Sequence, residues 1–172
     1  MTAMATVTLV LCPTLLRDTA PLPWREVEAT LRAWGLPVIA PHQVSSGIDD
    51  GDERMEMATW VAELAVAIAT AKVETPLILV SGGQANVAIP ALGFAQRAAR
   101  NSVVGYILVD GPLPSPGRGN SDWPDAPVIY IQSPTATGES SVAARARGWT
   151  TLHRDPADAI LEIARGWPDV VL

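Results

Sequence analysis

Apolar runs of strand length alternate with helical patterns along this chain. The runs are rich in apolar residues without polar alternation, which predicts strands buried on both faces of a sheet. They cover residues 6–12, 37–41, 76–80, 103–110, 127–133 and 149–153. Apolar residues at three- and four-residue spacing predict helices between them. These helices cover residues 24–35, 52–71, 84–100, 138–147 and 156–167.

Repeated strand–helix–strand units predict an α/β fold, a doubly wound and mostly parallel six-stranded sheet with helices on both faces. The chain has 172 residues, which suits a single domain spanning 1–172. Proline 90 lies inside the third helical pattern and should kink that helix or tighten its first turns. The segment 111–126 is rich in glycine and proline and predicts a long loop.

Composition narrows the classes of partner. The formal net charge is −6, and no segment concentrates lysine and arginine, so a nucleic-acid partner is not expected. The most apolar helical pattern is interrupted by glutamates and predicts no membrane span. One cysteine and the lack of a secretory signal pattern favour the cytoplasm. No Cys/His cluster, GxGxxG or Walker lysine occurs, so neither a metal nor a cofactor is expected.

The stretch PLILVSGGQANVAIPAL, residues 76–92, has the layout of a nucleophile elbow. A strand over 77–80 runs into the turn Ser81-Gly82-Gly83, and a helix is predicted to begin near Gln84. In such an elbow the catalytic serine is presented at the tip of the turn. Here the tip is a glycine, which has no atom that could attack a substrate.

Four segments resemble successive parts of a bacterial alpha/beta-hydrolase family, in the same order along the chain. They are LVSGGQANVAIPAL, GYILVDGPLPSPG, WPDAPVIYIQSP and ARARGWTTLHRDPADAILEIA. The resemblance implies a minimal hydrolase core with the strand order 2-1-3-4-5-6. Two opening strands of larger relatives are missing, and the loop 111–126 replaces the cap. A generic flavodoxin-like arrangement is the alternative architecture.

The resemblance also shows where a catalytic triad would lie. The family's nucleophile is third in a small-x-nucleophile-x-small motif, which puts Gly83 at its position. The acid would fall within 133–138, SPTATG, which contains no carboxylate. The histidine expected after the sixth strand would lie in a longer loop than the one at His153. The chain is therefore similar to a hydrolase that lacks its triad.

Three residues are candidates for catalysis. Ser81 would be a displaced nucleophile, although a small residue packed at the end of a buried strand is the simpler interpretation. Asp110 ends the fourth strand, at the edge where open parallel sheets bind ligands, and is either the remaining acid or a turn former. His153 is either a relocated general base or a half-exposed residue before the last helix. His42 is a less favoured candidate.

Backbone amides could still bind a ligand after loss of the serine. Thr14 and Leu15 fall on the loop that supplies half of the oxyanion hole in the family, and Gln84 follows the elbow tip. Gly82 and Gly83 would clear space for close approach of the ligand. Trp123 is a candidate ligand wall in the loop 111–126. Cys12 has no basic neighbour in sequence and is expected to be a buried structural thiol.

Three functions remain open. The first is a non-hydrolytic enzyme of the isomerase or cyclase type, which binds a small carbonyl-bearing or anionic metabolite or a peptide. The second is a non-catalytic binding or scaffold protein, with a second subunit covering the crevice in a homodimer. The third is a serine hydrolase that uses Ser81.

Overall fold

The computed structural model describes residues 6–15, 21–41, 52–115 and 122–167. In chain order its elements, with η1 a 3-10 helix, are β1 (Thr8–Leu11), α1 (Trp24–Ala33), β2 (Val38–Ile39), α2 (Glu53–Ala71), β3 (Leu77–Gly82), η1 (Gly83–Ala88), α3 (Ile89–Ala98), β4 (Val103–Val109), β5 (Val128–Gln132), α4 (Ser140–Ala146), β6 (Thr150–His153) and α5 (Pro156–Gly166). Within these residues six strands form one sheet in the order β2-β1-β3-β4-β5-β6. All neighbouring strands are parallel, which confirms the predicted fold class and strand order.

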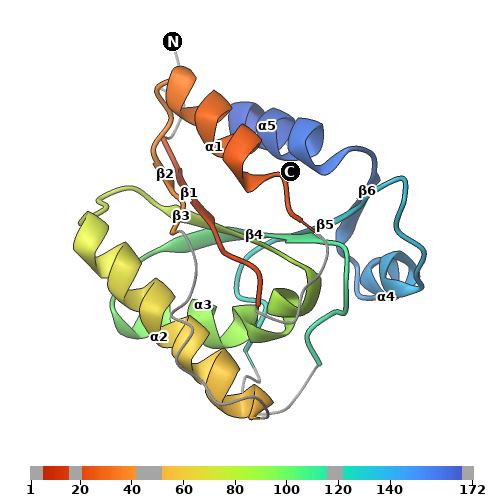
Figure 1. The fold of residues 1–172 in the computed structure, drawn as a ribbon, viewed down its shortest axis with the longest axis horizontal. Coiled ribbons are helices and arrows are strands. Elements are labelled where there is room, and N and C mark those ends of the chain that lie inside the picture. Colours follow the sequence, from red (N-terminus) through yellow and green to blue (C-terminus); the bar gives the residue numbers. More distant parts are fainter. Residues whose placement is uncertain (1–5, 16–20, 42–51, 116–121, 168–172) are drawn as a thin grey trace.

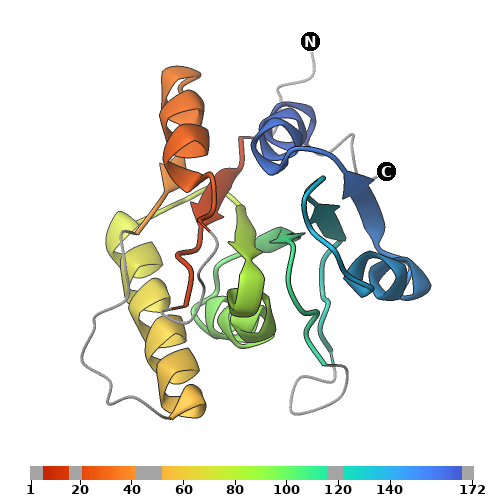
Figure 2. The same cartoon turned by 45° about the vertical axis from the view of Figure 1, so that its right-hand side comes forward.

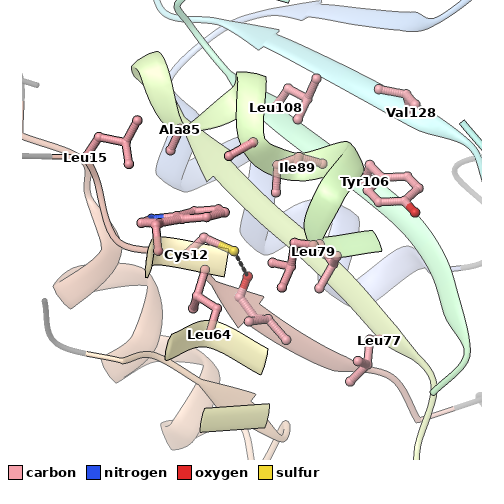
Figure 3. Close-up of a cluster of buried hydrophobic side chains, with 14 of the residues drawn as sticks. Cys12, Leu15, Leu64, Leu77, Leu79, Ala85, Ile89, Tyr106, Leu108 and Val128 are labelled. Atoms are coloured by element: carbon pink, nitrogen blue, oxygen red, sulfur yellow. Dashed lines mark hydrogen bonds between the residues drawn. The ribbon is translucent and has the colours of Figure 1, made fainter. Parts of the chain in front are cut away.

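Helices cover both faces of the sheet. Figures 1 and 2 show α1 and α5 on one face and α2, α3 and α4 on the other. One buried cluster lies between the sheet and α2, α3 and α4, and it includes Trp60, Ile89 and Tyr106 (Figure 3). A second cluster, which includes Leu31 and Ile160, lies under α1 and α5. The central strands are therefore buried on both sides, which is why they have no polar alternation.

Two predicted elements differ from the structure in extent. The strand predicted over 37–41 is only Val38–Ile39, because β2 lies at the sheet edge beside β1 and is flanked by prolines that lack an N–H donor. The helix predicted over 84–100 begins as the 3-10 helix η1 and becomes α-helical only at Ile89. Pro90 lies in the first turn of α3, so the expected tightening of the first turns is confirmed.

One aromatic side chain from the end of α5 reaches the middle of the sheet. Gly105 lies within β4, and a Cβ atom added there would collide with the indole of Trp167. Trp167 is 6% exposed and belongs to the cluster under α1 and α5. Glycine in a strand interior often marks such a close approach, and here the indole packs directly on the β4 backbone.

Candidate functional site

The turn after β3 lies at the carboxyl edge of the sheet. β3 ends at Gly82 and η1 begins at Gly83, whose φ of 62° lies in the left-handed region. A residue with a side chain adopts that region only with strain. A strand, a sharp turn and a helix are the parts of a nucleophile elbow. Gly83 lies at its tip and contributes no side chain there.

The space beside the elbow glycines is filled. A Cβ atom added at Gly82 would lie 2.6 Å from Cδ2 of Leu22, a residue just before α1. A Cβ atom added at Gly111 would lie 2.6 Å from the carbonyl oxygen of Gly83, so these two backbones are in direct contact. On this side Leu22 packs against Gly82, and the Gly111 backbone contacts that of Gly83, so a ligand-binding role of Gly82 and Gly83 stays a prediction.

Ser81 takes part in a buried clamp between β3 and β4. Its hydroxyl is fully buried and donates to Oδ1 of Asn86 at 2.7 Å. The Asn86 amide nitrogen donates in turn to the backbone carbonyl of Asp110 and, at 3.5 Å, to that of Val109. Sequence reasoning missed Asn86, whose only signal was a polar residue directly before the apolar stretch VAIPAL. The clamp holds the elbow against the end of β4.

Asp110 follows β4 in a left-handed conformation with a φ of 48°. Its backbone N–H donates to the carbonyl of Ile131 at 3.0 Å. Its side-chain Oδ1 accepts the backbone N–H of Ser133 at 2.8 Å. These two hydrogen bonds tie the end of β4 to the end of β5 and fix the direction of the carboxylate.

The larger of two described cavities, of about 620 Å³, lies beside Asp110. Its ten described lining residues come from the segment before α1, the ends of β4 and β5 and the start of α5. The polar side chains among them are Asp110, Ser133, Thr135 and Asp155. None of the ten is basic, so two carboxylates set the charge of this lining. The carboxyl edge of an open parallel sheet is where ligands bind in α/β folds.

A smaller cavity of about 260 Å³ brings together two residues predicted to bind a ligand. Leu15 comes from the loop after β1 and Gln84 from the first turn of η1. Glu53, Glu56 and Met57 of the first turns of α2 complete the described lining. Thr14 is half-buried in the same loop but lines neither described cavity. Leu15 and Gln84, one from each half of the expected amide site, therefore line one cavity together with two glutamates.

The other candidates lie elsewhere. His153 is exposed at the end of β6, where its register partner is Gln132, and it lines neither described cavity. The Trp123 ring packs edge-on between Tyr106 and Trp149, with centroid distances of 5.4 and 5.6 Å. It lies against the core under α2, α3 and α4 and lines neither described cavity. His42 falls outside the described residues.

Burial shifts three titratable groups. Cys12 is fully buried and its Sγ contacts the carbonyl of Val10 (Figure 3), so burial raises the pKa of the thiol and keeps it protonated and unreactive. Burial also raises the pKa of Tyr106, as does Asp125, which accepts the phenol at 2.6 Å. Burial is the main cause of the raised pKa of Tyr130.

Among the described residues no group of three or more His, Cys, Asp or Glu side chains is placed to hold a metal ion. No helix in the described part of the chain has the length and apolar character needed to span a membrane.

Solved structures of other proteins share this arrangement of strands and helices. The NocB thioesterase domain from the nocardicin cluster has a TM-score of 0.54 and 14% identity over 92% of this chain and 87% of that domain. A protein named as a hydrolase of the alpha/beta superfamily, from Xanthomonas campestris pv. campestris, has a TM-score of 0.52 and 16% identity over 95% of this chain and 96% of its own. The fold is that of the alpha/beta hydrolases.

A protein named as a carboxylesterase, from Lactobacillus plantarum, is also similar, with a TM-score of 0.52 and 11% identity over 99% of this chain and 84% of its own. No family model matches the sequence, and no curated protein matches it. At these identities the likeness is one of fold, and chemistry has to be argued from the site.

In the alpha/beta-hydrolase fold, the elbow tip and the amide after it are the two places where attack and charge stabilisation occur. The sequence resemblance puts those two places at Gly83 and Gln84, which are the first two residues of η1 in the structure. One of the two carboxylates that line the larger cavity is that of Asp110, directly after β4. The segment 133–138 after β5 contains no carboxylate, but its Ser133 and Thr135 line the same cavity as Asp110.

Proposed function

We propose that this protein binds a small carbonyl-bearing molecule or a peptide at the carboxyl ends of the strands and promotes a non-hydrolytic step on it. The ligand occupies the larger cavity, and the step is an isomerisation, epimerisation or cyclisation. Asp110 takes a proton from the ligand and returns it, which is general acid–base catalysis by a positioned carboxylate. The observation that carries the proposal is the Asp110 carboxylate, held at the cavity wall by the Ser133 amide.

The surroundings of Asp110 suit this role. Ser133 and Thr135 follow β5 and line the same cavity, and their hydroxyl oxygens lie 3.5 Å apart, so either hydroxyl can accept from the other and donate to a ligand carbonyl. A carbonyl held by such donors makes the adjacent C–H more acidic, because charge developing on the oxygen is stabilised. The proton on that carbon is then the one that Asp110 moves.

The charge of the lining selects among the expected ligands. Asp110 and Asp155 both line the cavity, and no described lining residue is basic. A free carboxylate or phosphate would meet repulsion there, whereas a neutral carbonyl or an amine-bearing peptide would not. A carbonyl-bearing ligand is therefore preferred over an anionic one.

The contacts of Ser81 do not favour a serine hydrolase. A nucleophilic serine needs a base within hydrogen-bond reach and an open path to the substrate. The Ser81 hydroxyl is fully buried, donates to Asn86 and lines neither described cavity. We therefore expect a fluorophosphonate probe to leave the folded protein unlabelled, and labelling at Ser81 would contradict the proposal.

Non-catalytic binding is the second candidate function. It is supported by the packing of the turn after β3, where Leu22 lies against Gly82 and the Gly111 backbone contacts that of Gly83. A binding protein would keep the sheet and the larger cavity but would need no proton transfer. The two candidates share a ligand site and differ only in what Asp110 does there.

Replacing Asp110 with asparagine separates the two candidates. Asp110→Asn keeps an acceptor for the Ser133 amide but removes the base, so turnover should fall at least about 100-fold. Ligand binding, measured by thermal shift against neutral acyl, lactone and peptide-amide compounds, should persist. The matched control is Asp158→Asn, an exposed aspartate on α5 that does not line the cavity.

Two outcomes would contradict the proposal as stated. Turnover that survives in Asp110→Asn would remove this residue from the chemistry. Binding of carboxylate compounds in preference to neutral ones would contradict the ligand class. Gln84→Ala extends the test to the smaller cavity, because loss of binding in that variant alone would place the ligand there.

A further inference from the structure

Asp110 has a backbone conformation that is uncommon for a residue with a side chain. Its φ of 48° lies in the left-handed region, where a Cβ atom comes close to the following carbonyl oxygen. Aspartate enters this region more readily than most residues, but it is still a minority conformation. A strained residue of this kind persists only where the surrounding structure holds it in place.

Three hydrogen bonds hold Asp110, one at each part of the residue. Its backbone N–H donates to the carbonyl of Ile131 at 3.0 Å, which fixes the peptide before it. Its Oδ1 accepts the backbone N–H of Ser133 at 2.8 Å, which fixes the side chain. Its own carbonyl accepts from the amide nitrogen of Asn86, which fixes the peptide after it. Two of these partners belong to β5 and the residue after it, whereas Asn86 belongs to η1.

The groups around Asn86 fix the direction of its side-chain amide. Its Nδ2 contacts the carbonyl oxygens of Asp110 and, at 3.5 Å, of Val109. Carbonyl oxygens only accept, so the nitrogen has to face them. Its Oδ1 accepts from the Ser81 hydroxyl at 2.7 Å. Asn86 and Ser81 are both fully buried, so these bonds satisfy groups that water does not reach. The amide therefore has one orientation, with its donor toward Asp110.

We propose that Asn86, oriented by Ser81, is a positioning residue for Asp110. Its amide holds the backbone after β4 in the left-handed conformation, and this conformation brings the carboxylate to the Ser133 N–H at the wall of the larger cavity. Without the amide the backbone relaxes, and the carboxylate leaves that N–H. The inference rests on the proposed function, in which Asp110 moves a proton, because a catalytic group is effective only when it is held in the reactive geometry.

Hydrogen exchange of the Ser133 amide reports the position of the Asp110 carboxylate and needs no ligand. Native-state exchange followed by NMR measures local opening at each amide separately. In Asn86→Ala the Ser133 N–H should exchange about tenfold faster than in the wild type, as expected for the loss of about one hydrogen bond. An unchanged Ser133 rate in this variant would overturn the proposal.

Leu64→Ala is the matched control for a loss of overall stability. It also truncates a buried side chain to alanine, but Leu64 lies on α2 and lines neither described cavity. Urea denaturation should show that this variant is destabilised, while its Ser133 amide should exchange close to the wild-type rate. Equal Ser133 rates in Asn86→Ala and Leu64→Ala would overturn the proposal, because Asn86 would then act only through overall stability.

Ser81→Ala is a milder variant that decides the question if Asn86→Ala does not fold. It removes one hydroxyl and leaves the Asn86 amide in place without the donor that orients its oxygen. The Ser133 amide should again exchange faster than in the wild type, by a smaller factor than in Asn86→Ala. A Ser133 rate that is the same as in the wild type would contradict the role of this pair.

Turnover separates this inference from the proposed function. The probe is γ-butyrolactone in D2O, with deuterium incorporation beside its carbonyl followed by NMR. In Asn86→Ala the kcat of incorporation should fall about tenfold with little change in KM, because Asn86 positions the base but lines neither described cavity. Loss of turnover in Asp110→Asn without any loss in Asn86→Ala would overturn the positioning role alone. A wild type that incorporates no deuterium would count against the proposed function, whereas faster Ser133 exchange in Asn86→Ala would still support the positioning of Asp110 by Asn86.

Discussion

Gly111 and Gly35 have nearly the same left-handed backbone, with φ values of 73° and 72°, in different surroundings. A Cβ atom at Gly35 would meet nothing within 4 Å, whereas one at Gly111 would collide with the backbone of Gly83. The contact between Gly111 and Gly83 is thus made possible by two residues without side chains. It holds the turn after β3 against the turn after β4.

Alanine substitution at Gly35 and at Gly111 separates the cost of a left-handed backbone from the cost of a steric collision. Gly35→Ala should lower the free energy of unfolding by about 1 kcal/mol, the cost of a left-handed backbone. Gly111→Ala should lower it by about 3 kcal/mol or more, because backbone atoms have to move as well. Urea denaturation of both variants measures the difference. Equal losses would show that Gly111 and Gly83 are not in contact.

Two elements, β3 and η1, are joined to β4 through the side chain of Asn86. This amide is fully buried, accepts from Ser81 and donates to the backbone after β4. Asn86→Ala leaves the Ser81 hydroxyl and a backbone carbonyl without these partners, so unfolding should become easier by about 2–3 kcal/mol. Asn101→Ala is the comparison, because its half-buried amide donates to Oε1 of the buried Gln96 and only this one acceptor loses its partner, so it should cost about 1 kcal/mol, less than Asn86→Ala. Chemical denaturation compares them.

The sequence pattern predicted most of the strands and helices correctly. Unbroken apolar runs identified β1, β3, β4 and β5, because strands buried on both faces leave no other pattern. Pro90 correctly predicted tight first turns after the elbow. The contact of Leu22 with Gly82 had no such signal, since Leu22 precedes α1 and belongs to no periodic stripe. Contacts of this kind depend on tertiary packing alone.

For the whole molecule, stability should fall as the pH rises above about 10. Burial, and then Asp125, raise the pKa of Tyr106 above its ordinary value of 10, so the folded state keeps a proton that the unfolded chain loses. A pKa that is higher in the folded state than in the unfolded chain stabilises the fold fully at pH values below the pKa of the unfolded chain. This stabilisation is lost as the pH rises above that pKa, by at most about 1.4 kcal/mol per pH unit.

Tyr106→Phe isolates this effect. The variant should be less stable at neutral pH by about 1–2 kcal/mol, because Asp125 loses the phenol as a donor. It should also lose less stability than the wild type between pH 9 and pH 11, as measured by guanidinium unfolding at each pH. Tyr130, whose pKa is also raised, titrates in both proteins and so cancels in the comparison.

The candidate site was only partly predictable from the sequence. Asp110, Leu15 and Gln84 line cavities because the carboxyl ends of parallel strands meet at one edge, a consequence of topology that the strand pattern contains. His153 and Trp123 were chosen by residue type and by loop position, neither of which fixes where a side chain points. The sequence pattern located the edge of the sheet, whereas the cavity walls depend on packing.

The position of Trp167 has a consequence for how the chain matures. Its indole covers β4 at Gly105, and every strand precedes it in the sequence. All six strands therefore leave the ribosome before this indole does, and the sheet face beneath α1 and α5 stays incompletely covered until synthesis reaches residue 167. A nascent chain stalled before that residue would present apolar β4 surface to chaperones.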